Sequence, residues 1–401
     1  MAAVASPRVR SILALACCVF GAAIAVSSVA PLRAADSEVR ALWVRRASID
    51  SSDAIRKMVA SASTAGFNTL FVQVAEDGIA SASGFDPVAE TIAQAHAVGL
   101  RVHAWVDVAR VAAPDELPTD RDHVIYLHPD WLMVPRAIAG ELIALDTRNP
   151  DYLGRLERWT RLNSSRVDGL YISPLQSDVA AYLAVAVRGL VRHYALDGVY
   201  LDHVQYPGDD FDYSQRSVAA FRDFMRTQLP PAERQRIDAI ETIDPFAYPN
   251  ELPDQWRLFR QSQLTALIAR LTSTVKAERP SALVSAAVTS DAAIAARDNF
   301  QDWRTWLENG FLDALCPMAS AADAAAIAAQ LTQVRALAGD KPVWLGIGAN
   351  HLSQRETIDD IASARRAGVH GVILYSYDTL ISPAKGIDFL SAIGRGAFDS
   401  F

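Results

Sequence analysis

A single acidic side chain ends the most regular apolar stretch of the sequence. Residues 197–207 read DGVYLDHVQYP, and alternation along an extended strand places Val199 and Leu201 on one face. Asp202 then shares the opposite face with Tyr200. A carboxylate in such a place destabilises the fold if it is dry and unpaired, so it requires a partner cation or a reacting substrate. We predict that Asp202 is a catalytic carboxylate, and a structural ion pair is the alternative.

Asp202 would lie near the carboxyl end of one of eight predicted strands. Short runs rich in Val, Leu, Ile and aromatic residues alternate with longer segments of helical period, which is typical of parallel strands joined by crossover helices. Glycines that can end a helix in the left-handed conformation precede three of these strands. The pattern predicts an α/β fold, specifically a (β/α)8 TIM barrel. The predicted strands span residues 41–46, 68–74, 100–106, 198–203, 282–288, 313–318, 343–348 and 371–377.

Long loops follow the third and fourth predicted strands, at residues 109–168 and 207–254. Because barrel sites are built at the carboxyl ends of the strands, we expect these loops to form the walls of a groove. The first loop contains HPDW at 128–131, and Trp131 is expected either to stack on a ligand or to anchor the loop. No internal repeat or linker is evident, so we expect residues 36–401 to form one barrel domain.

The first 35 residues are expected to be a secretory signal peptide. Arg8 and Arg10 precede an uncharged apolar run and then small residues, and the run is shorter than a membrane-spanning helix requires. An uncleaved N-terminal anchor and lipid attachment at Cys17 or Cys18 are the alternatives. The segment holds three arginines and no acid, so its removal would change the net charge from −8 to about −11. We expect a secreted or periplasmic protein with no membrane span in the mature chain.

Composition limits the partners and cofactors. The acidic net charge leaves no basic stripe to replace counterions along phosphates, so nucleic acid is not an expected partner, and the oligomeric state stays open. Cys316, the one cysteine after the leader, is expected to pack in the core. Neither a metal nor another cofactor is predicted, because His103 is isolated and no strand carries a His-x-His pair. His203 is expected to point away from Asp202 while the strand stays regular.

Several short motifs, taken together, point to one family. They are RALWV at 40–44, GFN at 66–68 with VQV at 72–74, FDP at 85–87, AHA at 95–97 with GL at 99–100 and HAW at 103–105, HPDW at 128–131, DG at 197–198 with LD at 201–202 and YP at 206–207, and Trp303 with Asp313. With these motifs the chain resembles the family 10 glycosylhydrolase-like proteins, bacterial exported barrels related to the α-amylase-type glycosidases. The resemblance covers most of the mature chain.

The resemblance implies a glycosidase that cuts O-glycosidic bonds in a bacterial envelope or extracellular polysaccharide, such as peptidoglycan glycan strands. It places Asp202 where amylase-like relatives hold their nucleophile. Three departures leave the general acid open. The family often has a second Asp where this chain has His203, and an arginine-rich turn where this chain reads AEDG at 75–78. The fifth predicted strand ends in VTSD at 288–291, without the glutamate of amylase-like enzymes.

Hydrolysis of a glycosidic bond uses two carboxyl groups, one protonated and one ionised. Glu76 and Asp77 follow the second predicted strand and Asp291 follows the fifth, so all three should lie on the same rim as Asp202. We predict Glu76, ahead of Asp291, as the second catalytic carboxyl group. A solvated loop acid is the alternative for each.

Aromatic and polar residues near the strand ends are expected to complete a sugar site. Flat rings stack on sugar faces and amides bind hydroxyl groups, although rings in these positions also fill barrel interiors. The predicted substrate-binding residues are Gln73, Trp105, Asp107, His203, Tyr206, Asn350, Tyr375 and Tyr377, with Trp43, His351 and Asp378 similarly placed.

Two other functions fit parts of the sequence. A barrel that kept its sugar groove and lost its general acid would bind glycans without cutting them, as the missing glutamate after the fifth strand suggests. A metal-dependent hydrolase would need two or three His or Asp ligands that converge on one ion.

Overall fold

The structure is a computed structural model that describes residues 38–74, 84–318, 324–386 and 388–398. These residues all belong to one compact unit, Glu38–Phe401. The predicted signal peptide at residues 1–35 lies outside them. Among the described residues, no helix combines the length and the apolar character needed to cross a bilayer.

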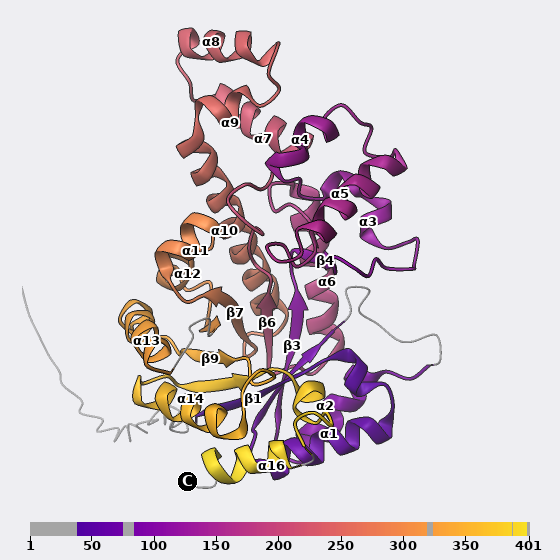
Figure 1. Cartoon of the computed structure of the whole chain (residues 1–401), viewed down its shortest axis with the longest axis vertical. Helices are drawn as coiled ribbons and strands as arrows, with labels where there is room; N and C mark the ends of the chain where they lie inside the picture. The colour runs from indigo at the N-terminus through magenta and orange to yellow at the C-terminus, as the bar shows by residue number, and fades with distance from the viewer. Residues whose placement is uncertain (1–37, 75–83, 319–323, 387, 399–401) are drawn as a thin grey trace, which may run out of the picture. The chain divides into compact units, whose positions relative to one another are not determined.

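Eight parallel strands close into a barrel (Figure 1), in the circular order β1, β2, β3, β6, β7, β8, β9 and β10. The prediction of a TIM barrel is confirmed, and each strand falls close to its predicted range. The strands are β1 (Val39–Val44), β2 (Thr69–Gln73), β3 (Arg101–Asp107), β6 (Gly198–Asp202), β7 (Leu283–Thr289), β8 (Ala314–Met318), β9 (Trp344–Ile347) and β10 (Gly371–Leu374).

Helices surround the barrel, and several begin at a side chain that caps their free backbone N–H groups. Asp86 accepts from two N–H groups at the start of α2, and Ser353 forms a capping box with Glu356 at the start of α14. These helices and turns are η1 (Arg46–Ile49), α1 (Ser52–Thr64), α2 (Pro87–Ala97), α6 (Ser177–His193), α10 (Pro253–Glu278), α11 (Ala292–Asp298), α12 (Trp303–Glu308), α13 (Ala324–Ala338), α14 (Gln354–Arg366), α15 (Tyr377–Leu380), α16 (Phe389–Ile393) and η3 (Gly394–Phe398).

Both long loops rise from the carboxyl end of the barrel and are largely helical (Figure 1). Residues 109–172, here called the excursion, contain the antiparallel pair β4–β5 as well as helices. The excursion consists of β4 (Arg110–Ala112), α3 (Val124–Leu127), η2 (Pro129–Trp131), α4 (Arg136–Leu142), α5 (Pro150–Leu162) and β5 (Leu170–Tyr171), and the second loop contains α7 (Gln215–Arg226), α8 (Pro231–Glu241) and α9 (Ala247–Glu251).

The core has an outer layer between strands and helices and an inner layer inside the barrel. Val199 and Leu201 belong to the outer layer, whereas Tyr200 belongs to the inner one, as the strand alternation predicts. The inner layer is strongly aromatic, and it also holds the buried thiol of Cys316. Asp202 is the next inward-facing position of β6 above Tyr200, so the strand delivers its carboxylate to the mouth of the barrel.

Gly198, at the start of β6, offers a test of this packing. A Cβ atom there would lie 2.6 Å from the His103 ring and 2.8 Å from the backbone oxygen of Leu283. We expect Gly198→Ala to lower the free energy of unfolding by about 1–3 kcal/mol through overpacking, measured by urea denaturation. Gly189→Ala in α6 is the matched control, since nothing lies within 4 Å of its added Cβ. An unchanged midpoint for Gly198→Ala would contradict the packing.

Candidate functional site

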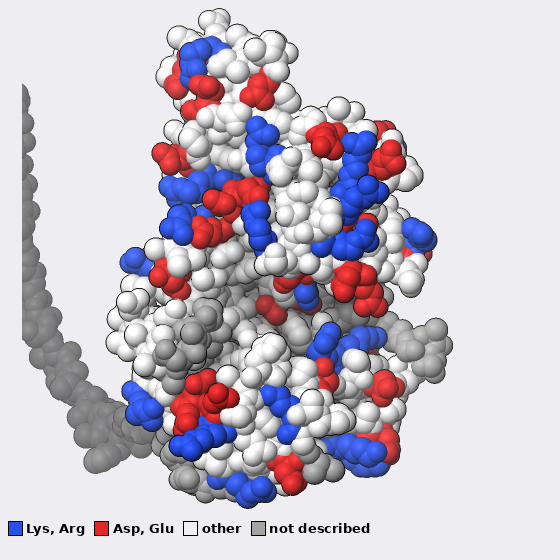
Figure 2. Space-filling view, in the orientation of Figure 1, with Lys and Arg blue, Asp and Glu red and all other residues white. Residues whose placement is uncertain are grey.

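The mouth of the barrel contains a cavity of about 380 Å³ that Asp202 reaches. Figure 2 shows this face of the molecule hollowed between the excursion helices and the barrel. Asp202 is only 8% exposed, so its carboxylate forms part of the floor. The cavity is lined by Trp43, Trp105, Asp168, Asp202, His203, Gln205, Ala287, Val288, Thr289, Met318 and Tyr375.

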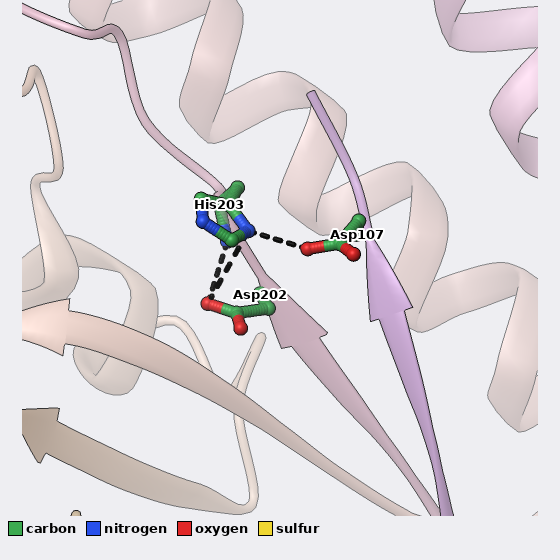
Figure 3. A group of neighbouring side chains, drawn as sticks. All are labelled: Asp107, Asp202 and His203. Carbon is green, nitrogen blue, oxygen red and sulfur yellow. Dashed lines mark hydrogen bonds and ion pairs between the residues drawn. The ribbon is translucent and has the colours of Figure 1, made fainter. Parts of the chain in front are cut away.

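His203 breaks the strand directly after Asp202. Its φ is 48°, in the left-handed region that non-glycine residues adopt only uncommonly. The turn brings the backbone N–H of His203 within 2.8 Å of Asp202 Oδ1, to which it donates. The ring lies beside Asp202 as well, with Nδ1 3.7 Å from the same oxygen (Figure 3). The prediction that His203 points away from Asp202 is therefore wrong, because strand alternation ends one residue earlier than it assumed.

Three carboxylates surround the His203 ring. Asp107, at the end of β3, lies 2.5 Å from Nδ1 (Figure 3), and Asp202 is the second neighbour of the same nitrogen. Asp168, from the excursion, lies 3.3 Å from Nε2. Because both ring nitrogens face carboxylate oxygens, both must carry hydrogen for the contacts to be favourable. His203 is thus held as an imidazolium.

The same contacts move the pKa values of these groups apart. Burial would lower the pKa of His203, but the surrounding carboxylates outweigh it and raise the pKa to about 10. Burial raises the pKa of Asp202 and outweighs the lowering effect of the His203 charge, and the charge of Asp107 raises this pKa as well. Burial would also raise the pKa of Asp107, yet the hydrogen bond and charge of His203, with Arg110 nearby, lower it. Asp202 is therefore the carboxyl group most easily protonated, while Asp107 stays ionised.

Aromatic rings form one side of the cavity. Trp43 and Trp105 stack with ring centroids 5.0 Å apart, and Tyr375 lies 4.8 Å from Trp43. Both indole N–H groups are buried without a hydrogen-bond partner. The nitrogens are therefore out of reach of a ligand in the cavity, and what this wall offers is the flat apolar surface of its rings.

The sequence profile of one family, described as Glycosyl hydrolase-like 10, matches residues 75–347, which is most of the barrel. The chain belongs to the Glycosyl hydrolase-like 10 family. This assignment confirms the resemblance read from the short motifs.

Named relatives are similar only in part. Glycosyl hydrolase DigH of Escherichia coli (strain K12) is 23% identical over 320 residues, which cover 69% of this chain and 58% of that protein. Glycosyl hydrolase YngK of Bacillus subtilis (strain 168) is 24% identical over 176 residues, covering 41% of this chain and 28% of that protein. The chain thus spans less than two thirds of the length of these relatives.

Solved glycosidases share the fold. The glycoside hydrolase domain of PgaB (BpsB) from Bordetella bronchiseptica aligns with a TM-score of 0.56 at 14% identity, covering 91% of this chain and 100% of that one. The catalytic domain of a beta-amylase from Paenibacillus polymyxa aligns with a TM-score of 0.59 at 12% identity, covering 90% and 98%. At these identities the likeness concerns the barrel architecture alone.

Five of the predicted substrate-binding residues of this Glycosyl hydrolase-like 10 barrel gather at the site. Trp105, His203 and Tyr375 line the cavity. Asp107 contacts His203. Gln73 donates from Nε2 to Asp107 Oδ2 at 3.4 Å, so it contacts the cluster through Asp107. These residues come from β2, β3, β6 and the end of β10, as convergence of strand ends requires.

The other three predicted binding residues do not line the cavity. Tyr206 is fully buried and packs edge-on against Phe300. Asn350 shares a hydrogen bond with the neighbouring His351. Tyr377 is buried in the outer layer of the core. Past the last strand position the chain turns, so distance from a strand along the sequence no longer fixes the direction of a side chain.

The structure describes one of the predicted second carboxyl groups, Asp291. It caps α11 by accepting from the N–H groups of Ala293 and Ile294, and it does not line the cavity. Glu76 and Asp77 lie outside the described residues, so the prediction of Glu76 stays a prediction. Among the described residues, Asp107 is a carboxyl group near Asp202, with oxygen atoms of the two side chains within 4.8 Å of each other.

The sequence analysis expected the excursion to form a wall of the groove, but it identified none of the residues through which the excursion reaches the site. Asp168 lines the cavity, and Arg110 lies 3.8 Å from both Asp107 and Asp168. Tyr171 donates from its hydroxyl to Asp168 Oδ1 at 2.6 Å. No motif marks these residues, and only the pairing of β4 with β5 brings them to the barrel mouth.

Asp107, Asp202 and His203 also place one potential metal-ligand atom each within 4.8 Å of one another. A histidine ligates a metal through a deprotonated ring nitrogen. Here Nδ1 and Nε2 both face carboxylates, which favours the protonated ring. The geometry therefore fits an ion-paired cluster better than a metal centre.

Trp131 of the HPDW motif anchors the excursion. It is 6% exposed, and His128 stacks on it with ring centroids 4.0 Å apart. Both residues border a separate cavity of about 720 Å³, which excursion residues line together with Asp178 of α6 and residues 214–216 of the second loop. Of the two roles predicted for Trp131, the structure shows the loop anchor.

The charge state of His203 makes a prediction for stability. Its pKa is higher in the folded chain than in the unfolded one, so its contribution is complete below about pH 6.5 and is lost as the pH rises to 10. We expect the free energy of unfolding to fall across this window, by up to about 1.4 kcal/mol per pH unit. His203→Asn should lack this decline and be less stable at pH 6.

Asparagine is chosen because it tolerates positive φ, so the variant removes the charge and keeps the turn. Urea denaturation at several pH values measures the effect. His351→Asn, at an exposed histidine, is the control and should follow the unmodified protein. If the free energy of unfolding changed with pH in the same way for His203→Asn and the unmodified protein, that result would contradict a charged His203.

Proposed function

We propose that this chain is a glycoside hydrolase that cuts O-glycosidic bonds of an envelope or extracellular polysaccharide, with peptidoglycan glycan strands as the first substrate to test. The observation that carries the proposal is the close pair of carboxyl groups, Asp202 and Asp107, within 4.8 Å of each other. Their pKa values are shifted in opposite directions. One protonated and one ionised carboxyl group are what this hydrolysis needs.

The pKa shifts support a definite division of roles. Asp202, with its raised pKa, donates a proton to the oxygen of the leaving sugar. Asp107, which His203 and Arg110 keep ionised, does not line the cavity itself, and its negative charge stabilises the positive charge that develops at the anomeric carbon. The family resemblance implies the nucleophile role for Asp202, and the electrostatics of this site favour the acid role instead.

The remaining walls suit a sugar. The stacked rings of Trp43 and Trp105 offer a flat apolar face, and Gln205 and Thr289 add polar groups. The volume of about 380 Å³ lies in the range of small-molecule pockets, roughly 300–1,000 Å³. Export to the periplasm or the medium is part of the proposal, and it rests on the composition of the first 35 residues.

Glycan binding without cleavage is the second candidate. The observation that favours it is that β7 brings no glutamate to the mouth and that Asp291 is engaged as a helix cap. Such a protein would keep the aromatic wall and would bind oligosaccharides without releasing new reducing ends.

Asp202→Asn tests the catalytic role. We expect it to reduce the release of reducing ends from peptidoglycan strands or bacterial glucans by at least about 100-fold, because the proton donor is lost. Binding of the same oligosaccharides and the melting temperature should change little. Asp298→Asn, at a surface acid paired with Arg297, is the control.

Equal activity of Asp202→Asn and the unmodified protein would refute the assignment. Binding by both proteins without any cleavage would favour the second candidate. A chelator should leave activity intact, and its loss on chelation would favour the metal-dependent alternative.

The spacing of the two carboxyl groups predicts the stereochemistry. Retaining glycosidases hold their carboxyl groups about 5–5.5 Å apart, and inverting enzymes hold them roughly 6.5–9.5 Å apart. One oxygen of Asp107 lies within 4.8 Å of one oxygen of Asp202, which is nearer to the retaining than to the inverting separation, so we expect retention of the anomeric configuration. Proton NMR of the first products measures it, and products of inverted configuration would show that Asp107 is not the second carboxyl group.

A further inference from the structure

Asp168 differs from the other two carboxylates around His203, because it belongs to the excursion and not to a barrel strand. Its side chain is 55% exposed, whereas those of Asp107 and Asp202 are 16% and 12% exposed. It contacts Nε2 of His203, whereas Asp107 contacts Nδ1. The excursion therefore reaches into the site through this residue.

The excursion holds Asp168 in place from both sides. Tyr171 of β5 donates a hydrogen bond to Oδ1, and Arg110 of β4 lies 3.8 Å from Oδ2. The next residue, Gly169, approaches the backbone of β4 so closely that an added Cβ would lie 2.1 Å from the oxygen of Ala112. This close approach leaves the carboxylate of Asp168 little freedom to turn away from His203.

Nε2 of His203 requires a hydrogen only because Asp168 faces it. Without that carboxylate, a neutral ring with hydrogen on Nδ1 alone would still satisfy Asp107. The charged and titratable groups around the ring are Asp107 on β3, Arg110 on β4, Asp168 and Tyr171 next to or on β5, and Asp202 on β6. Loss of one anion from this set lowers the pKa of His203.

The charge of His203 in turn governs the Asp107–Asp202 pair. The hydrogen bond from Nδ1 lowers the pKa of Asp107. A neutral His203 would hold Asp107 in the ionised state less strongly. The proposed reaction depends on an ionised Asp107.

We propose that Asp168 is a positioning residue, through which the excursion keeps His203 protonated and oriented against Asp107. The inference rests on the proposed function for its effect on catalysis. The charge of His203 itself can be measured without any substrate.

Asp168→Asn tests the inference in the full chain labelled at histidine. We expect NMR titration to show the pKa of His203 lowered by about one unit or more, the size expected when a neighbouring opposite charge is removed. The His203 signal is identified by its absence from the spectrum of His203→Asn. Asp168→Glu keeps the charge and should restore part of the shift.

Asp115→Asn is the matched control, because Asp115 is an exposed acid on the same excursion. For hydrolysis of a peptidoglycan or glucan substrate, we expect Asp168→Asn to move the alkaline limb of the rate profile to lower pH. It should lower kcat more than it changes KM. A merely structural role for Asp168 would lower the melting temperature and leave the His203 titration unchanged.

The outcomes separate this inference from the proposed function. If the unmodified protein releases no reducing ends from any glycan, the proposed function fails, and the His203 titration still decides the role of Asp168. If it cleaves a glycan and Asp168→Asn matches it in both titration and pH profile, the role of Asp168 is overturned and the proposed function stands.

Discussion

The site depends on one buried cation, the imidazolium of His203, held among three carboxylates. Asp107 and Asp202 come from neighbouring barrel strands, and the charge of Asp107 adds to burial in raising the pKa of Asp202. The ring of His203 sets the order between them, because its hydrogen bond goes to Asp107 and leaves Asp202 the easier group to protonate. An acid and an ionised carboxylate thus arise from two residues of the same type.

The barrel below the site explains why these groups are so strongly perturbed. Aromatic and aliphatic side chains fill its interior directly beneath Asp202, including Trp43, Trp105 and Tyr200. This layer excludes water from one side of the cluster, so burial acts on each of its members. The rings of Trp43 and Trp105 also line the cavity, so part of the packing that gives the barrel its core also forms the surface that a sugar would contact.

The fold was predictable from the sequence and the site only in part. Strand alternation placed Val199, Leu201 and Asp202 correctly, because a regular backbone fixes the direction of each side chain. The same rule misplaced His203, whose φ of 48° accompanies its contacts with carboxylates distant in sequence. Asp291 shows a different limit: an acid before a run of helix-forming residues also has the pattern of a helix cap, which is the role it takes here.

The two-stranded sheet β4–β5 of the excursion positions side chains that contact groups at the ends of barrel strands. Arg110 and Asp168 both contact groups at the ends of barrel strands, and Asp168 lies two residues before β5. A residue inserted or removed between Asp168 and β5 would therefore displace the carboxylate from His203, whereas a change of length in the outer helices would leave the β4–β5 pairing in place. A relative with a different excursion would need another way to keep a charged group at this position, or a different residue in place of His203.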